Sequence, residues 1–222
     1  TAANVISDIP VLITAVTDPV AAGIVSNMEN PKTNISGTTD MNPVAKQIEL
    51  IKKFLPELKN LGILYNPGEV NSVVQVKLAK EKAKEMGIKL EEATVSNSSE
   101  VSLAASSLVD SVDAIYVPTD NIIVSAMPTV LQTAYNNNIP VFASENNSVE
   151  QGAIATLGID YYQLGKQTGS MAAKILNGAD PSEMSVESSE ELKLYINKSS
   201  ADRIGLEVPA ELMDTADTIF EE

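Results

Sequence analysis

The 222-residue sequence contains no cysteine and no histidine. These absences exclude disulfide bonds, zinc sites with thiolate or imidazole ligands, cysteine or histidine nucleophiles and an imidazole general base. The protein therefore lacks the residues on which most hydrolase and transferase mechanisms usually depend. We expect a protein that holds no metal, uses no cofactor and is not an enzyme.

Positive charge is scarce as well. The chain has 15 basic residues against 30 acidic ones, a net charge of −15, and Arg203 is its single arginine. A negative surface repels a phosphate backbone, so nucleic acid is not an expected partner. A single arginine also removes the bidentate clamps that commonly hold phosphates and dicarboxylates.

Long apolar runs are missing too. No run approaches the ~20 residues that span a bilayer, so the chain as given is expected to be soluble. The first residues, TAANVISDIPVLITAV, look like the end of a helix followed by a strand. This opening predicts that further residues precede the chain.

Short β-branched runs alternate with segments of helical periodicity along the whole chain. Strands are predicted at 9–16, 34–38, 61–65, 88–95, 114–117, 139–143, 153–157 and 192–196. Helices are predicted at 43–55, 72–86, 100–109, 124–136, 162–176 and 199–204. Because strands that alternate with helices form βαβ units, the fold class is α/β, with parallel sheets covered by helices on both faces.

Polar residues follow most of the predicted strands, as in AIYVPTDN (114–121) and IPVFASENN (139–147). Ligands of open parallel sheets bind at the carboxyl ends of the strands, so these loops predict a polar binding crevice. Asp, Asn, Ser and Thr are also the preferred helix caps, so any one of these loops is by default a cap or turn, and only the five loops together favour a crevice.

Two of these residues, Asp120 and Glu145, also suit an acid/base pair of glycoside chemistry. Against that reading, the sequence contains no nucleophile elbow, no phosphate-binding glycine loop and no GxGxxG motif. Carboxylates among hydroxyls and amides suit recognition of a ligand ammonium group, so binding is favoured over catalysis. Tyr116 and Phe142 lie inside strands and are predicted to be core residues.

Four segments together carry a resemblance to a known family. They are TAVTDPVAAGIV (14–25), NISGTTD (34–40), YVPTDNIIVSAMPTV (116–130) and IPVFASENNSVEQGAIATLGIDYYQLGKQTGSMAAKIL (139–176). In this order they resemble the substrate-binding proteins of ABC transporters of the tryptophan/tyrosine type. The resemblance covers nearly the whole chain.

The resemblance implies a type I periplasmic-binding-protein fold of two Rossmann-like lobes. It assigns 1–38 and 158–222 to the remainder of an N-terminal lobe and 39–157 to a complete C-terminal lobe. Family members begin with a lipoprotein signal and a further portion, on the order of 80 to 100 residues, that has no counterpart here. An incomplete lobe would expose strand edges, so dimerisation or strand exchange is an expectation that light scattering tests.

The resemblance also implies the function: capture of an amino acid in the crevice between two lobes and delivery to a membrane permease. An aromatic ligand, tryptophan or tyrosine, is favoured. Because the chain has six Tyr, three Phe and no Trp to stack on such a ligand, phenylalanine and a non-aromatic amino acid stay open. It places the full-length protein on the extracellular face of the membrane with a lipid anchor. The implied ligand-binding residues are Thr17, Asn66, Thr119, Asp120, Asn121, Ser144, Glu145 and Asp160.

Specific roles follow from the same resemblance. Asp120 would pair with the ligand's ammonium group, and Asp18 would cap a turn. Asp120→Ala is then expected to weaken binding by ~1.5–3 kcal/mol without unfolding the protein. The effector domain of a LacI-type regulator shares the implied fold and stays open as the alternative function, although the acidic balance does not favour it.

Overall fold

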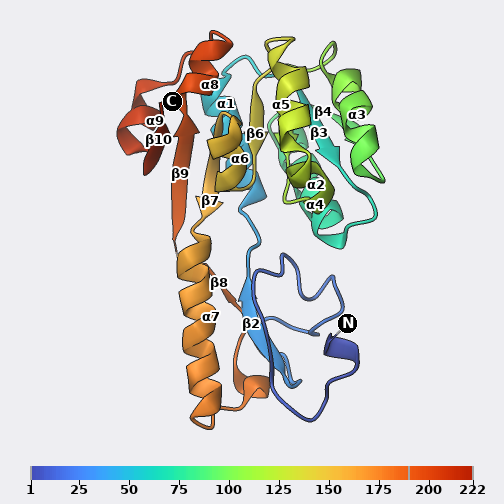
Figure 1. The fold of residues 1–222 in the computed structure, drawn as a ribbon, viewed down its shortest axis with the longest axis vertical. Coiled ribbons are helices and arrows are strands. Elements are labelled where there is room, and N and C mark those ends of the chain that lie inside the picture. The colour runs from blue at the N-terminus through green and yellow to red at the C-terminus, as the bar shows by residue number, and fades with distance from the viewer. Residues whose placement is uncertain (1, 190, 222) are drawn as a thin grey trace. The chain divides into compact units, whose positions relative to one another are not determined.

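A computed structural model describes residues 2–189 and 191–221, and the chain divides into two compact units (Figure 1). The larger unit comprises residues 43–158 and 193–222, and the smaller unit comprises residues 1–42 and 159–192. This division corrects the predicted grouping for residues 193–222, which were assigned to the smaller unit. The boundary between the first segments also falls after Asn42 and not after Thr38.

The C-terminal segment joins the larger unit because it adds strands and apolar side chains there. Strand β9 (Leu192–Asn197) lies between β7 (Ala155–Ile159) and β10 (Thr218–Phe220), and β9 and β10 are parallel. Ile196 and Leu212 are buried in the core of this unit. Helix α9 (Ala210–Thr215) and β10 lie in a stretch that the sequence showed only as an acidic tail, so neither was predicted.

A four-stranded parallel sheet of order β4-β3-β5-β6 forms the centre of the larger unit. Its strands are β3 (Asn60–Tyr65), β4 (Lys89–Thr94), β5 (Ala114–Val117) and β6 (Val141–Ala143). Backbone bonds from Ile154 N–H to the Val141 carbonyl, 2.6 Å, and from Asn197 N–H to the Ile154 carbonyl, 2.8 Å, link β6 onward toward β7 and β9.

Both faces of this sheet are covered by helices, as predicted. Along β5, Ala114 and Tyr116 pack in one apolar cluster while Ile115 and Val117 pack in the other, because successive side chains of a strand point to opposite faces. Helices α1 (Val44–Phe54) and α2 (Val70–Glu85) contribute to the first cluster. The second cluster contains residues of α3 (Val101–Leu108), α4 (Asn121–Ser125), α5 (Met127–Tyr135) and α6 (Asn146–Gln151).

Two local features of the larger unit bear on the sequence predictions. The helix expected at 124–136 is divided into α4 and α5, with Pro128 in the first turn of α5, where its missing N–H is not needed. Gly87 adopts φ = +70° directly after α2 and Met86, which confirms its predicted place at the helix end. A 3-10 turn, η2 (Ser98–Glu100), precedes α3, and α8 (Lys198–Arg203) follows β9.

The smaller unit has a three-stranded sheet of order β1-β2-β8, which is parallel throughout. Its elements are η1 (Ala2–Asn4), β1 (Val11–Ile13), β2 (Ile35–Thr39), α7 (Tyr161–Leu176), η3 (Pro181–Glu183) and β8 (Glu187–Ser188). Gly37 has φ = +143°, and a Cβ atom there would lie 1.9 Å from the Ile13 carbonyl oxygen. The pairing of β1 with β2 therefore requires glycine at this position.

Among the residues that the structure describes, no helix has both the length and the apolar character needed to cross a membrane.

Candidate functional site

The carboxyl ends of β3 and β5 are joined by the Asp120 carboxylate. Asp120 caps α4, its Oδ1 accepting from Ile123 N–H at 2.9 Å, while Oδ2 accepts from Asn66 N–H and from the Ser72 hydroxyl, each at 2.6 Å. The side chain has 0% exposure. The structural role of Asp120 is thus to fix the loops after β3 and β5 to each other.

Glu69, which was not among the predicted site residues, organises the exposed part of the same edge. Its Oε2 accepts from the backbone N–H of Asn121 at 3.0 Å and from the Asn121 side-chain amide at 2.6 Å. Its Oε1 accepts from the Asn66 amide at 3.3 Å. Partial burial acts to raise the pKa of Glu69, but these hydrogen bonds outweigh it and hold the pKa below its usual value.

The predicted residues Asn66, Thr119, Asp120 and Asn121 are therefore brought together in one network. The Thr119 carbonyl accepts from the Asn71 amide at 2.8 Å and from the Gln75 amide at 3.2 Å. Asn66, Thr119 and Asn121 keep part of their surface accessible, whereas Asp120 does not. The sequence did carry a local signal for Glu69. It ends the turn Asn66-Pro67-Gly68-Glu69, which directly follows β3.

Ser144 and Glu145, at the end of β6, form a separate group. The Ser144 hydroxyl lies 2.7 Å from the Tyr116 hydroxyl, and Ser144 N–H donates to the Val117 carbonyl at 3.0 Å. Glu145 caps α6 by accepting from the N–H groups of Asn147 and Ser148, both at 2.7 Å. Burial raises the pKa of Tyr116 above its ordinary value.

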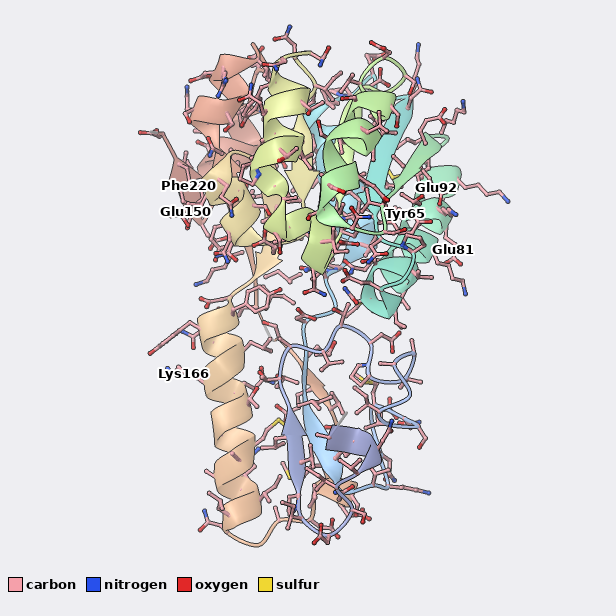
Figure 2. The ribbon with its side chains drawn as sticks, turned by 45° about the vertical axis from the view of Figure 1, so that its right-hand side comes forward. Tyr65, Glu81, Glu92, Glu150, Lys166 and Phe220 are labelled. Atoms are coloured by element: carbon pink, nitrogen blue, oxygen red, sulfur yellow. The ribbon has the colours of Figure 1, made fainter. Side chains whose placement is uncertain are left out.

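The core prediction for the two strand aromatics is confirmed. Tyr116 and Phe142 are buried, and the Phe142 ring meets Phe54 edge to face, with centroids 5.4 Å apart. Another tyrosine of this unit, Tyr65, ends β3 and donates from its hydroxyl to Glu92 Oε2 at 2.9 Å (Figure 2). Lys80 forms an ion pair with the same carboxylate at 2.9 Å.

The two predicted residues of the smaller unit, Thr17 and Asp160, lie in different groups. The Thr17 hydroxyl donates to Oδ1 of Asp40 at 2.9 Å. Asp160 caps α7 by accepting from the N–H groups of Tyr162 and Gln163, at 3.0 and 3.1 Å. Asp18 accepts from the N–H groups of Val20 and Ala21, so its predicted turn-capping role is confirmed.

Asp160 also lines a groove of about 440 Å³ along α7, whose other side is formed by residues around β8. Lys166 and Lys174 of α7 line one side of the groove, and Glu187 and Glu191 line the other side. Lys166 additionally lies over the Tyr162 ring, 5.6 Å from its centroid. The groove is polar and carries both signs of charge.

Metal ligation finds no support in the described part of the chain. Across residues 2–189 and 191–221, no group of three or more acidic, histidine or cysteine side chains is arranged to hold an ion. The carboxylates at the strand ends are instead occupied by helix N–H groups, hydroxyls and amides. These hydrogen-bonded carboxylates do not resemble the oxygen cages of hard cations.

Solved structures define the class of fold. A LacI family transcriptional regulator from Bifidobacterium animalis subsp. lactis has a TM-score of 0.59 and 14% identity, covering 87% of this chain and 77% of that chain. At this identity the likeness shows the fold alone. The chain has a periplasmic-binding-protein-like α/β fold with parallel sheets.

The family follows from closer matches. The model of the ABC transporter substrate binding protein family matches residues 1–220, and the chain belongs to that family. A crystal structure from Streptococcus pneumonia of an ABC domain in complex with L-Trp is 35% identical with a TM-score of 0.93, over 98% of this chain and 74% of that chain. The tyrosine-binding protein of Clostridioides difficile (strain R20291) is 45% identical over 89% of this chain.

The chain spans 57% of the length of that tyrosine-binding protein. The family is one of binding proteins, which supports the prediction of a non-enzyme. Under this assignment, Asp120 and Glu145 need no acid/base role, because the structure gives each a helix to cap.

Proposed function

We propose that this chain is the ligand-binding part of an ABC importer and that it binds an aromatic amino acid, tryptophan or tyrosine. The observation that carries the proposal is the family match over residues 1–220, together with one relative in complex with L-Trp and another described as tyrosine-binding. Polar groups at the strand ends are of the kind that orient a zwitterion by charge-assisted hydrogen bonds.

The binding-site residues proposed are those that follow the strands of each unit. They are Thr17 and Asp160 in the smaller unit and Asn66, Thr119, Asp120, Asn121, Ser144 and Glu145 in the larger unit. The accessible members, Asn66, Thr119 and Asn121, are suited to touch the ligand directly. The buried members Asp120 and Glu145 are suited to hold the strand-end loops in a fixed position, because their oxygens accept backbone N–H groups.

The partner and location follow from the same family. A binding protein of an ABC importer delivers its ligand to a membrane permease from outside the cytoplasm, and we propose both for this chain. A lipid anchor in the full-length protein belongs to the same proposal. Metabolic labelling of the full-length protein with a radioactive fatty acid tests it, and a protein that carries no label contradicts the anchor.

Isothermal titration of the full-length protein against the 20 standard amino acids tests the proposed ligand. We expect a one-to-one complex with tryptophan, tyrosine or both, and much weaker binding of alanine and glutamate, which lack an aromatic ring. The D-enantiomer of the best ligand is the matched control, because a site that orients the ammonium and carboxylate groups distinguishes the two hands. Failure of all amino acids to bind would overturn the proposal.

The LacI-type alternative has no comparable support. Its likeness to this chain lies at 14% identity and shows the fold alone. The net charge of −15 also gives no electrostatic footprint for DNA. The importer function is therefore the one we propose.

A further inference from the structure

A buried carboxylate that is not among the predicted site residues lies at the strand ends of the smaller unit. Asp40 directly follows β2 and has 4% exposure. Thr17, which follows β1, donates its hydroxyl to Oδ1 at 2.9 Å, and Tyr161, the first residue of α7, donates its hydroxyl to Oδ2 at 3.1 Å. The carboxylate therefore lies where three elements of this unit begin or end.

The charge of Asp40 has no cationic partner in the described part of the chain. The ion pairs found there join lysines to other acidic residues, and none includes Asp40. A buried carboxylate without a cation is costly, because two neutral hydroxyls replace only part of its hydration. Burial accordingly raises the pKa of Asp40, although the hydroxyls of Thr17 and Tyr161 and a backbone N–H act in the opposite direction.

Asp120, the other strand-end aspartate that is almost fully enclosed, is placed differently. Two of its three donors are backbone N–H groups, of Asn66 and Ile123, which keep their positions as long as the fold persists. The side-chain donors of Asp40 are hydroxyls, which rotate and accept as well as donate. The hydroxyl donors of Asp40 can therefore readjust around an incoming donor group, whereas the backbone amides at Asp120 are fixed.

We propose that Asp40 is the carboxylate that receives the ammonium group of the amino-acid ligand, with the Thr17 and Tyr161 hydroxyls holding it in orientation. This inference rests on the proposed function and adds the residue that recognises the amine. An ammonium group supplies three N–H donors, and its positive charge is the cationic partner that the buried carboxylate otherwise lacks. Binding of the ligand then relieves the cost of an unpaired charge, so the amine is recognised strongly.

Asp40→Asn tests the proposal, because it removes the charge while keeping the size of the side chain. The probes are L-tryptophan and L-tyrosine and their analogues without the amino group, indole-3-propionate and 3-(4-hydroxyphenyl)propionate. We expect the variant of the full-length protein to bind the amino acids about 10- to 150-fold more weakly, the range for a charged hydrogen bond. Its affinity for the analogues should stay within about threefold of the wild-type value, since they do not use the pair.

The matched control is Asp18→Asn, which removes one negative charge from the same unit. Asp18 caps a turn through Val20 and Ala21, and asparagine caps such turns equally well. We expect this variant to bind the amino acids within about twofold of wild type. A comparable loss in Asp18→Asn would mean that general electrostatics, not a specific pair, explains the effect, and it would overturn the proposal.

The remaining outcomes are equally decisive. Equal losses for amino acids and analogues would make Asp40 a structural residue, and unchanged affinity would remove it from the site. A selective loss in Asp120→Asn instead would assign the ammonium group to Asp120. If Asp40→Asn does not fold, the wild-type protein gives the answer. Acidification that protonates Asp40 must weaken tryptophan more than indole-3-propionamide, which has neither an amino group nor a carboxyl group that titrates. Parallel weakening of the two overturns the pair. A wild-type protein that binds no amino acid contradicts the proposed function itself.

Discussion

The two units of this chain place their buried aspartates in different surroundings. In the larger unit, Asp120 lies at the carboxyl ends of β3 and β5, in a sheet with an apolar cluster on each face, and backbone N–H groups supply most of its hydrogen bonds. In the smaller unit, Asp40 follows a short sheet with a much smaller apolar cluster, around Val25, Ile35 and Val186, and its side-chain donors are hydroxyls.

The comparison shows that burial alone does not define the role of a carboxylate. Asp120 and Asp40 have 0% and 4% exposure, so accessibility does not distinguish them. The type of donor does: backbone amides bind a carboxylate as part of the fold, whereas hydroxyls leave its charge in need of a cation. The first arrangement stabilises loops, and the second is suited to a ligand.

Substitution at Gly37 should have the largest effect, because it breaks the smaller sheet itself. In Gly37→Ala the added Cβ would meet the Ile13 carbonyl 1.9 Å away at a φ of +143°. We expect the smaller unit to lose about 3 kcal/mol of unfolding free energy or more, measured by urea denaturation. Gly169→Ala in α7, where no atom lies within 4 Å of the new Cβ, is the control and should stabilise by about 0.5–1 kcal/mol. Equal behaviour of the two variants would contradict the close β1–β2 approach.

Asp120→Ala comes next and tests the structural half of the comparison. Removal of the carboxylate leaves the Asn66 and Ile123 N–H groups and the Ser72 hydroxyl without their acceptor. We now expect a loss of about 2 to 3 kcal/mol in the stability of the larger unit, in contrast to the sequence-based expectation of an intact fold. Asp160→Ala, which removes a more exposed cap, should cost about 1 kcal/mol. Thermal unfolding monitored by circular dichroism provides both values, and an unchanged Asp120→Ala melting curve would leave only a ligand role for Asp120.

The pH dependence of stability should separate Asp40 from ordinary carboxylates. Because burial raises the pKa of Asp40 in the folded state, the native protein keeps this proton to a higher pH than the unfolded chain does. Its contribution to stability is therefore greatest at low pH and falls as pH rises from the usual aspartate value, ~3.9, through the raised one. The difference in unfolding free energy between Asp40→Asn and wild type, followed across this window, should grow with pH. A flat difference would show that Asp40 titrates normally.

Glu69 should show the opposite sign with a smaller amplitude. Its pKa is lowered in the folded state, so its stabilising contribution is present above the usual glutamate value, ~4.3, and is lost as pH falls through the lowered value. Glu69→Gln should cost about 0.5–1 kcal/mol near neutral pH and little at low pH, since the pairs with Asn121 lie at the surface. Denaturant titrations at two pH values measure this, with Glu81→Gln, on the exposed side of α2, as the control. A cost that persists at low pH would contradict the assigned sign.

Much of the larger unit was predictable because its signals are local. The strand Ala114–Val117 was predicted with the observed bounds, and the glycine at the end of α2 has the expected conformation. Asp18 was correctly assigned to a turn for the same reason: its partners are two and three residues away. Residues 193–222 were misplaced because nothing local shows that a strand next to an acidic segment pairs with β7 and buries Ile196.

The candidate site was only partly predictable. Sequence position selected Asn66, Asp120 and Asn121, which do meet at one edge, but it missed Glu69, whose bonds to Asn121 span 52 positions in the chain. Asp40 was missed as well, because its partners Thr17 and Tyr161 are 23 and 121 positions away. The sequence shows where the carboxylates are in the chain, but only the fold determines which hydrogen-bond donors lie next to each of them.

The sequence by itself determined the class of this protein: its strand and helix pattern, its lack of cysteine and histidine, and its family segments lead to an α/β binding protein. These properties depend on the types of residue present and on spacings of a few residues, and both can be read directly from the sequence. The tertiary structure alone decided that Asp120 is bound mainly by backbone amides, while the side-chain donors of Asp40 are hydroxyls and no cation from residues 2–189 or 191–221 pairs with it. Solvation of a buried charge depends on atoms brought together from distant parts of the chain, and no local pattern specifies them.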